Sequence, residues 1–188
     1  PPTFTAPVNI MIFRDGACEY DASVGETGDV SDELDNCDVG EATFVDVVDD
    51  SDPCEVVITR TWSLVDNCGN AASDQIQVIT VKDNTPPTFT APADLMIFRD
   101  ADCEYDASVG ETGDVSDEMD NCEVGEATFV DDIDDSDPCE VVITRTWSLT
   151  DACDNAASDQ IQIITVKDNT PPTFTAPVNI MIFRDGAC

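Results

Sequence analysis

Residues 55–64 read Glu-Val-Val-Ile-Thr-Arg-Thr-Trp-Ser-Leu, and this stretch decides the fold class. Val56, Ile58 and Trp62 fall on one face of an extended chain, because side chains of a β-strand alternate between its two faces. The surrounding sequence has no sustained helical period. Short runs rich in β-branched and aromatic residues are instead bounded by Gly, Pro, Asp and Asn, which is typical of all-β proteins.

Five strands are predicted around this stretch, over residues 4–13 with a kink at Pro7, 19–24, 42–48, 55–64 and 75–81. We expect all five to be antiparallel, and an odd number makes the chain enter at one end of the domain, the entry pole, and leave at the other, the exit pole. We expect a β-sandwich with Trp62 and its counterpart Trp147 buried, rather than exposed as sugar-stacking platforms. Arg60 shares the face of Trp62 and is expected to cap the core or to pair with a carboxylate.

The first predicted strand is apolar on both faces. Met11 and Phe13 fall opposite Ile10 and Ile12. Either one face packs against another chain, or the strand is split and crosses between the two sheets of the sandwich.

An internal repeat organises the chain. Pro-Pro-Thr-Phe-Thr-Ala-Pro occurs at residues 1–7, 86–92 and 171–177, a period of 85 residues, and residues 1–85 differ from residues 86–170 at 13 positions. The sequence thus predicts two tandem immunoglobulin-like modules, unit 1 (1–85) and unit 2 (86–170), and the first strand of a truncated third unit (171–188). Short Pro-stiffened linkers predict an elongated rod. The lack of an initiator Met, signal peptide or transmembrane run indicates a portion of a longer polypeptide.

The composition limits the possible partners and the compartment. Seven Lys+Arg against 41 Asp+Glu give a net charge of −34, which argues against binding to nucleic acid or to anionic lipid. Nine Cys and no His in 188 residues indicate disulfides and an oxidising, extracellular or cell-surface location rather than zinc. Each unit has four Cys, and Cys188 is the first of the third unit.

The expected poles suggest a disulfide pairing within each unit. Cys18 and Cys54 precede strands that start at the exit pole, whereas Cys37 and Cys68 follow strands that end at the entry pole. Of the three connectivities open to four cysteines, this favours Cys18–Cys54 and Cys37–Cys68 in unit 1, and Cys103–Cys139 and Cys122–Cys153 in unit 2.

The acidic residues gather at the same two poles, so acidic clusters of successive units are expected to face each other. Bare carboxylates in proximity repel, and calcium accepts six to eight oxygen ligands in irregular geometry. We therefore predict calcium at each junction, locking the rod straight; the alternative is a solvated acidic face. The candidate ligands are Asp29, Asp32, Asp35, Asp49, Asp50, Asp52, Asp66, Asp83, Asp114, Asp117, Glu118, Asp120, Asp134, Asp135, Asp137, Asp151 and Asp168.

Three motifs in combination resemble hyalin-repeat-like modules: residues 83–89 (Asp-Asn-Thr-Pro-Pro-Thr-Phe), 58–64 (Ile-Thr-Arg-Thr-Trp-Ser-Leu) and 66–70 (Asp-Asn-Cys-Gly-Asn). Such modules occur in very large cell-surface proteins, especially of Bacteroidota-type bacteria. The resemblance covers each 85-residue unit. It implies an immunoglobulin-like sandwich, secretion, and a role in adhesion or in surface fibres. Unit 2 departs from the third motif, with Asp-Ala-Cys-Asp-Asn at residues 151–155.

Three functions compete at this level. Near-identical tandem copies favour a structural segment of a calcium-stabilised filament or adhesin stalk, whose partners are neighbouring repeats and other copies of itself. The alternative is a calcium-dependent module that binds a glycan or a protein. An enzyme is disfavoured, because the chain has no His and no nucleophile with an evident base.

Overall fold

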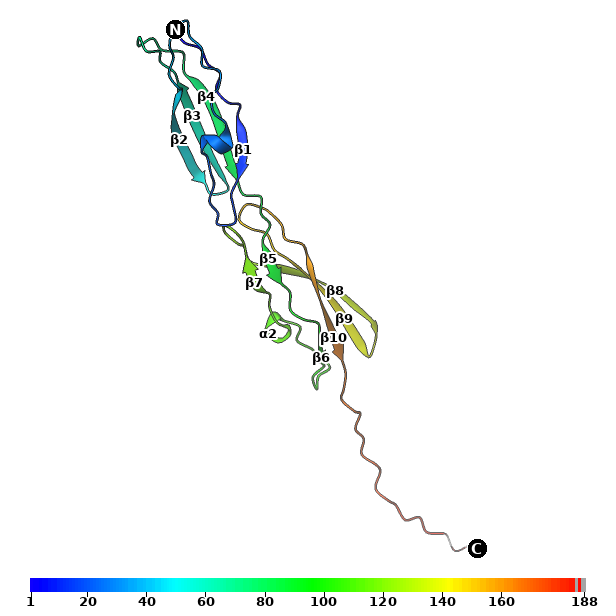
Figure 1. Ribbon diagram of the computed structural model, residues 1–188. Helices are drawn as coiled ribbons and strands as arrows, with labels where there is room; N and C mark the ends of the chain where they lie inside the picture. Colours follow the sequence, from blue (N-terminus) through cyan, green and yellow to red (C-terminus); the bar gives the residue numbers. More distant parts are fainter. Residues whose placement is uncertain (185, 187–188) are drawn as a thin grey trace.

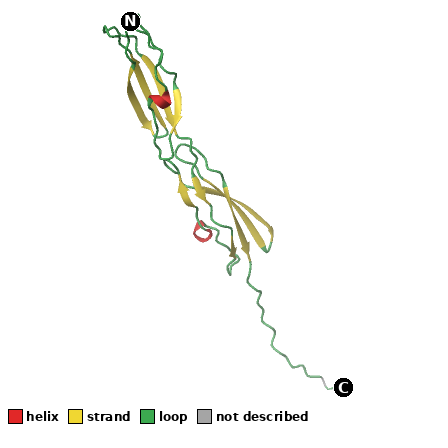
Figure 2. Cartoon of the chain, in the orientation of Figure 1, coloured by secondary structure: helices red, strands yellow, loops and turns green. Residues whose placement is uncertain are grey.

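The computed structural model describes residues 1–184 and 186, and its regular structure is almost entirely β (Figures 1 and 2). The predicted all-β class is therefore confirmed. Two four-stranded sheets follow one another along the length of the molecule, one in unit 1 and one in unit 2. The N-terminus lies at one end of the molecule, and residues 171–184 extend from the other (Figure 1).

The sheet of unit 1 has the strand order β1-β4-β3-β2. Its elements are β1 (Ile10–Phe13), α1 (Val24–Thr27), β2 (Thr43–Asp52), β3 (Glu55–Ser63) and β4 (Gln75–Lys82). Strands β2, β3 and β4 form an antiparallel meander, as predicted, but β1 runs parallel to β4. A wholly antiparallel arrangement was therefore a wrong prediction.

The strand predicted over residues 19–24 is also wrong. This segment is irregular and leads into the single turn of α1. A side-chain oxygen of Asp21 accepts a hydrogen bond from the backbone N–H of Ser23 at 2.8 Å. Such a local bond offers the backbone a partner other than a neighbouring strand, and so bends the chain.

Unit 2 shows how the first predicted strand is divided. Its elements are β5 (Thr88–Thr90), β6 (Leu95–Phe98), α2 (Val109–Thr112), β7 (Ser116–Met119), β8 (Thr128–Asp137), β9 (Glu140–Ser148) and β10 (Gln160–Lys167). Strand β5 pairs with β7 in a small second sheet, whereas β6 joins the main sheet in the order β6-β10-β9-β8. The split between two sheets, one of the two interpretations of this segment, is observed in unit 2. In unit 1 the counterpart of the small sheet is the single bridge between Thr3 and Leu34.

Pro92 lies at the break between β5 and β6, where a residue without an N–H cannot continue the ladder. It packs against Gly113, the residue after α2, which has φ +90°. A Cβ at Gly113 would lie 3.2 Å from the Cβ of Pro92, so the close approach and the positive φ both favour glycine.

The core of each unit lies on one face of its main sheet. Along β3 buried and half-buried residues alternate, which is the period-two pattern that the sequence predicted. Trp62 is fully buried with Phe4, Val30 and Leu64, and Trp147 occupies the same place in unit 2, so the predicted burial of both tryptophans is confirmed.

Arg60 is buried beside Trp62 and pairs with a carboxylate, one of its two expected roles. Its guanidinium donates to both carboxylate oxygens of Asp46, at 2.8 and 2.9 Å, to the hydroxyl of Thr27 and to the carbonyl oxygen of Ala22. Arg145 repeats the arrangement with Asp131. The arginine thus ties α1 and the preceding irregular segment to the main sheet.

The start of the third copy does not form the predicted strand within the described residues. Residues 171–184 have no strand and are exposed, and Phe174 is 92% accessible, whereas Phe4 and Phe89 in the same motif are each 6% accessible. The reason is topological: β1 and β6 pair with the last strand of their own units, which follows about 70 residues later. The assignment of Cys188 lies outside the described residues.

Candidate metal centre and disulfides at the junction between the units

The exit pole of unit 1 meets the entry pole of unit 2 at a contact that we call the junction. Unit 1 contributes the loop after β1, the hairpin between β2 and β3, and the linker after β4; unit 2 contributes the loops around residues 120–122 and 151–155. The amide of Asn121 donates to the backbone oxygen of Asp15 at 3.0 Å and to a carboxylate oxygen of Asp83 at 3.3 Å. These bonds connect the two units directly.

Two disulfides cross the junction. Cys18 of unit 1 is bonded to Cys122 of unit 2, with 4.9 Å between their Cα atoms, and Cys54 is bonded to Cys153, with 5.2 Å. Both Cα separations fall in the range usual for disulfides. The units are therefore connected covalently at two points in addition to the peptide linker.

The predicted pairings within units are wrong. Cys18–Cys54 and Cys122–Cys153 do not form, because all four cysteines pair across the junction; Cys37–Cys68 and Cys103–Cys139 do not form, because these four thiols are free. The prediction placed Cys18 and Cys54 together at the exit pole, and the structure does so. The prediction was wrong because it considered only pairs of cysteines within one unit. In the structure the sulfur atoms bonded to Cys18 and Cys54 belong to the next unit.

Three carboxylates gather at the junction. One oxygen from each of Asp83, Asp120 and Asp151 lies within 4.8 Å of the others, and Asp83 and Asp151 are 8% and 6% accessible. Asp83 comes from the linker, and the other two come from separate loops of unit 2. The cluster therefore exists only when the two units are in contact.

Some of these oxygens are buried without a hydrogen-bond donor. Asp83 Oδ1 accepts from the N–H of Thr85, and Asp120 Oδ2 accepts from the N–H of Cys122. The second oxygens, Asp83 Oδ2 and Asp120 Oδ1, are buried without a partner, as is Oδ1 of Asn121. Buried polar atoms without partners are rare in folded proteins, and a bound ion or an ordered water can satisfy them.

The third carboxylate is fixed in place by its own loop. Asp151 accepts from the backbone N–H groups of Cys153 and Asn155, each at 2.8 Å, and from the side-chain amide of Asn155 at 2.7 Å. These bonds orient the Asp151 carboxylate before any ion binds. A prepositioned ligand loses less conformational entropy on binding.

The electrostatics of the cluster favour a cation. None of the ion pairs among the described residues involves Asp83, Asp120 or Asp151. Two carboxylate charges about 4 Å apart repel by roughly 4 kcal/mol at an effective dielectric constant of about 20. The ligand atoms at the cluster are all oxygens, which suits a hard divalent cation. The residues therefore fit a metal ion.

The other predicted ligands lie outside the cluster of Asp83, Asp120 and Asp151, and many accept hydrogen bonds from nearby backbone N–H groups. Asp49 and Asp52 do so in the β2–β3 hairpin, and Asp134 and Asp137 in the β8–β9 hairpin, while Asp50 and Asp135 are exposed beside them. Further acceptors of this kind are Asp29, Asp32, Asp114 and Glu118, while Asp117 lies exposed in β7. Asp35, Asp66 and Asp168 occupy the cluster positions at the two outer poles.

Asn121 was missed at the sequence level. The signal was present, since Asp-Asn-Cys occurs at residues 35–37, 66–68 and 120–122. Asn beside a carboxylate and a cysteine offers an amide that can reach across a contact. Only the assembled junction shows which of the three copies does so.

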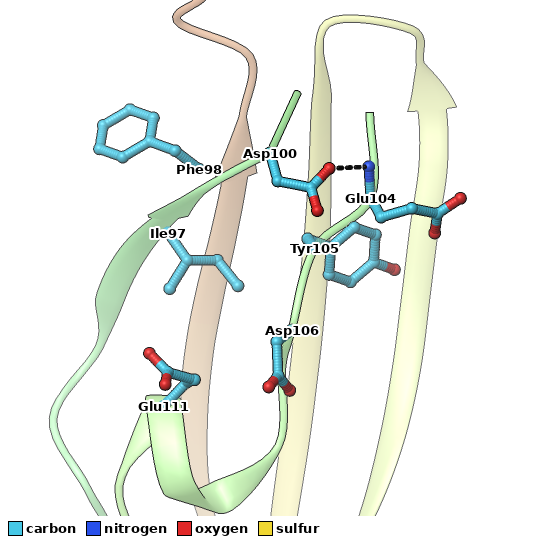
Figure 3. Close-up of a pocket in the computed structure, with 7 residues that line it drawn as sticks. All are labelled: Ile97, Phe98, Asp100, Glu104, Tyr105, Asp106 and Glu111. Carbon is cyan, nitrogen blue, oxygen red and sulfur yellow. Dashed lines mark hydrogen bonds between the residues drawn. The ribbon is translucent and has the colours of Figure 1, made fainter. Parts of the chain in front are cut away.

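A second feature is an open groove in each unit, of about 520 Å³ in unit 2 (Figure 3). It is lined by Ile97, Phe98, Asp100, Glu104, Tyr105, Asp106 and Glu111. Asp100 accepts from the backbone N–H of Glu104 at 2.9 Å, the contact drawn in Figure 3. The groove carries several carboxylates, yet among the described residues only the junction cluster brings three acidic oxygens within reach of one ion.

Comparisons with known proteins do not identify a family. No protein-family model matches the chain, and no curated protein matches it as a relative. Within residues 1–184 and 186, no helix has the length and apolar character needed to cross a membrane. The two disulfides indicate an oxidising environment.

Proposed function

We propose that the chain is a structural, non-catalytic segment of an extracellular, calcium-stabilised filament or adhesin stalk, built from hyalin-repeat-like, immunoglobulin-like units. One observation carries the proposal: two disulfides and a buried group of three carboxylates join the same pair of units. A contact of this kind restrains the angle between units, and a restrained angle is what a stalk needs to extend and to bear load.

Calcium is the proposed ion because of the ligand set. Asp83, Asp120 and Asp151 supply carboxylates, and neither nitrogen nor thiolate ligands compete with them, since the chain has no His and the nearby Cys are oxidised. Calcium accepts irregular oxygen sites and completes its shell with water, whereas magnesium requires near-octahedral geometry. When bound, the ion would neutralise the repulsion between the units.

Lateral association between chains is a further part of the proposal. Met11 and Phe13 of β1 are about half exposed on the open face of the sheet, with Val45 and Val47 of β2 on the same sheet. The net charge of −34 opposes contact between two such faces unless cations screen or bridge it. Bundling should therefore depend on divalent ions.

Small-angle X-ray scattering of the chain tests the stalk function. In calcium and without reductant we expect the scattering of one rigid, extended particle with a single well-defined maximum dimension. Adding a chelator together with a reductant should give the scattering of a flexible particle that samples a range of dimensions, because both restraints on the inter-unit angle are removed. A particle that is equally flexible under both conditions contradicts a rigid spacer.

A binding function remains a second candidate because of the groove shown in Figure 3. The same groove occurs in unit 1, lined by Tyr20 and the carboxylates of Asp15, Glu19, Asp21 and Glu26. An aromatic ring among oxygen acceptors can contact a sugar or a cationic side chain. Retention of the chain on an immobilised glycan or protein in calcium, and its loss on replacing both Tyr20 and Tyr105 by alanine, would favour this function.

A further inference from the structure

Each half of the junction has a counterpart at an outer end of the molecule. The exit pole of unit 1 contributes Cys18, Cys54 and Asp83; the same positions of unit 2 are Cys103, Cys139 and Asp168. The entry pole of unit 2 contributes Cys122, Cys153, Asp120 and Asp151; the same positions of unit 1 are Cys37, Cys68, Asp35 and Asp66. All four outer cysteines are free and exposed.

The outer exit pole has the local structure of the inner one. Cys103 has φ 66° and Cys18 has φ 62°, a left-handed conformation that is uncommon for a residue with a side chain. The backbone oxygen of each accepts from an arginine Nη1, Arg99 at 2.8 Å and Arg14 at 2.9 Å. The Cys103 thiol is thus presented as Cys18 is, although it has no disulfide partner.

The linker after unit 2 has the same sequence and local hydrogen bond as the linker after unit 1. Asp168 accepts from the N–H of Thr170 at 2.8 Å, as Asp83 accepts from Thr85 at 3.0 Å. Asp83 is buried by unit 2, whereas Asp168 is exposed. The five residues from Asp168 onward repeat those from Asp83, including the two prolines.

The outer entry pole also matches its inner counterpart. Asp35 accepts from the N–H of Cys37 at 3.0 Å, as Asp120 does from Cys122 at 2.8 Å. Asp66 accepts from the N–H of Cys68 at 2.9 Å, as Asp151 does from Cys153 at 2.8 Å. At their cysteine and aspartate positions, both outer surfaces therefore have the local hydrogen bonds of the junction before any partner is present.

We propose that the exit pole of unit 2 is a docking surface for the next copy of the unit in the same chain, whose first 18 residues are residues 171–188. Cys103 pairs with the counterpart of Cys37 in that copy, and Cys139 pairs with the counterpart of Cys68. Asp168 then completes a carboxylate cluster with the counterparts of Asp35 and Asp66. The cysteines of the repeat thus connect each unit to both neighbours, and none pairs within its own unit.

The chemistry requires an oxidant for each bond. Two thiols lose two protons and two electrons as one S–S bond forms, and a small-molecule disulfide such as oxidised glutathione accepts them and becomes two thiols. The proposal rests on the tandem array of the proposed function, but it concerns which cysteines pair rather than how stiff the array is.

The test continues the full 188-residue chain with the sequence of residues 19–85, which completes the third unit. Both chains are refolded with reduced and oxidised glutathione, alkylated under denaturing conditions, digested without reduction and analysed by mass spectrometry. In the 188-residue chain Cys103 and Cys139 should be alkylated. In the extended chain their alkylation should fall from nearly complete to nearly none, and peptides linking them to the counterparts of Cys37 and Cys68 should appear.

The experiment contains its own control, because both test chains begin at residue 1 and carry no unit before it, so Cys37 and Cys68 should stay alkylated in both. A Cys103–Cys139 bond, a bond within the third unit, unchanged alkylation of Cys103 and Cys139, or links only between separate molecules would each overturn the proposal. Failure of the proposed function would show differently, as a flexible particle in scattering with the Cys18–Cys122 and Cys54–Cys153 bonds intact.

Discussion

The junction and the outer ends of this molecule have nearly the same sequence but different surroundings. At the junction Cys18 is in a disulfide and Asp83 is buried; at the outer exit pole Cys103 is a free thiol and Asp168 is exposed. The local backbone and its hydrogen bonds agree at both places. The difference shows that a unit prepares its contact surface alone, and that bonding and burial come from the neighbour.

The largest expected effect comes from removing the two crossing disulfides. Replacing Cys18 and Cys54 by serine should lower the free energy of unfolding by about 2–5 kcal/mol for each bond lost, since each closes a long loop in the unfolded chain. The chain that lacks Cys103 and Cys139 is the matched control and should be unchanged. Chemical denaturation in calcium measures the free energy of unfolding of both variants. Equal losses would contradict the difference between the junction and the outer exit pole.

A similar comparison can be made with the repeated phenylalanine. Phe89→Ala should destabilise unit 2 by about 3–5 kcal/mol, because this side chain is buried against Trp147 and Leu149. Phe174→Ala, the same change in the third copy, should have no measurable effect on the 188-residue chain, because Phe174 is 92% accessible. Denaturant midpoints of the two variants provide the measurement; a loss of stability in Phe174→Ala would show that residues 171–184 pack on the units.

The carboxylate cluster should respond with opposite signs in calcium and in chelator. A ligand at about 100 times its Kd stabilises the folded state by about 2.7 kcal/mol, and Asp83→Asn should lose most of this calcium effect. In chelator the same variant should be more stable than the parent chain, because one of three mutually repelling charges is gone.

Asp168→Asn is the control for that comparison, because this carboxylate occupies the position of Asp83 but is exposed in the 188-residue chain. Its melting curve should follow that of the parent chain under both conditions. A parent chain whose melting midpoint is the same in calcium and in chelator would remove calcium from the proposed function.

The smallest expected effect is on the pH dependence of stability, and here the β2–β3 hairpin of the junction and the β8–β9 hairpin of the outer exit pole should behave alike. The side-chain and backbone hydrogen bonds from Ser51 lower the pKa of Asp49, and those from Ser136 lower the pKa of Asp134, below the ordinary value of 3.8. A carboxylate whose pKa is lower when folded stabilises the fold above its unfolded pKa, and this contribution disappears as the pH falls through the folded pKa.

Titration in chelator from about pH 6 to about pH 2 checks this point, since it begins above the ordinary carboxylate pKa and ends well below it. Ser51→Ala and Ser136→Ala should each flatten the acid end of the stability profile slightly and to the same extent. In each hairpin the serine and the aspartate are two residues apart, so the neighbouring unit should not change the size of the effect. A clear difference between the two variants would show that the junction alters its own hairpin.

Much of the fold followed from the sequence. The predicted strands over residues 42–48, 55–64 and 75–81 correspond to β2, β3 and β4, because β-branched residues and alternation act locally. The burial of Trp62 followed from the same alternation. The segment 19–24 was mistaken for a strand because its alternation is real, but an Asx hydrogen bond at Asp21 bends it. The parallel pairing of β1 with β4 depends on residues about 70 positions apart and could not be predicted locally.

By itself the sequence determined the repeat, the poles at which cysteines and carboxylates gather, and the acidic character that makes a cation useful. Only the tertiary structure decided that Cys18 pairs with Cys122, and that Asp83, Asp120 and Asp151 were selected from many acidic residues. The physical reason is that near-identical copies place the same cysteines and carboxylates in the same local structure. Which sulfur or carboxylate is the nearest partner depends on how one unit is placed against the next, and no local pattern records that placement.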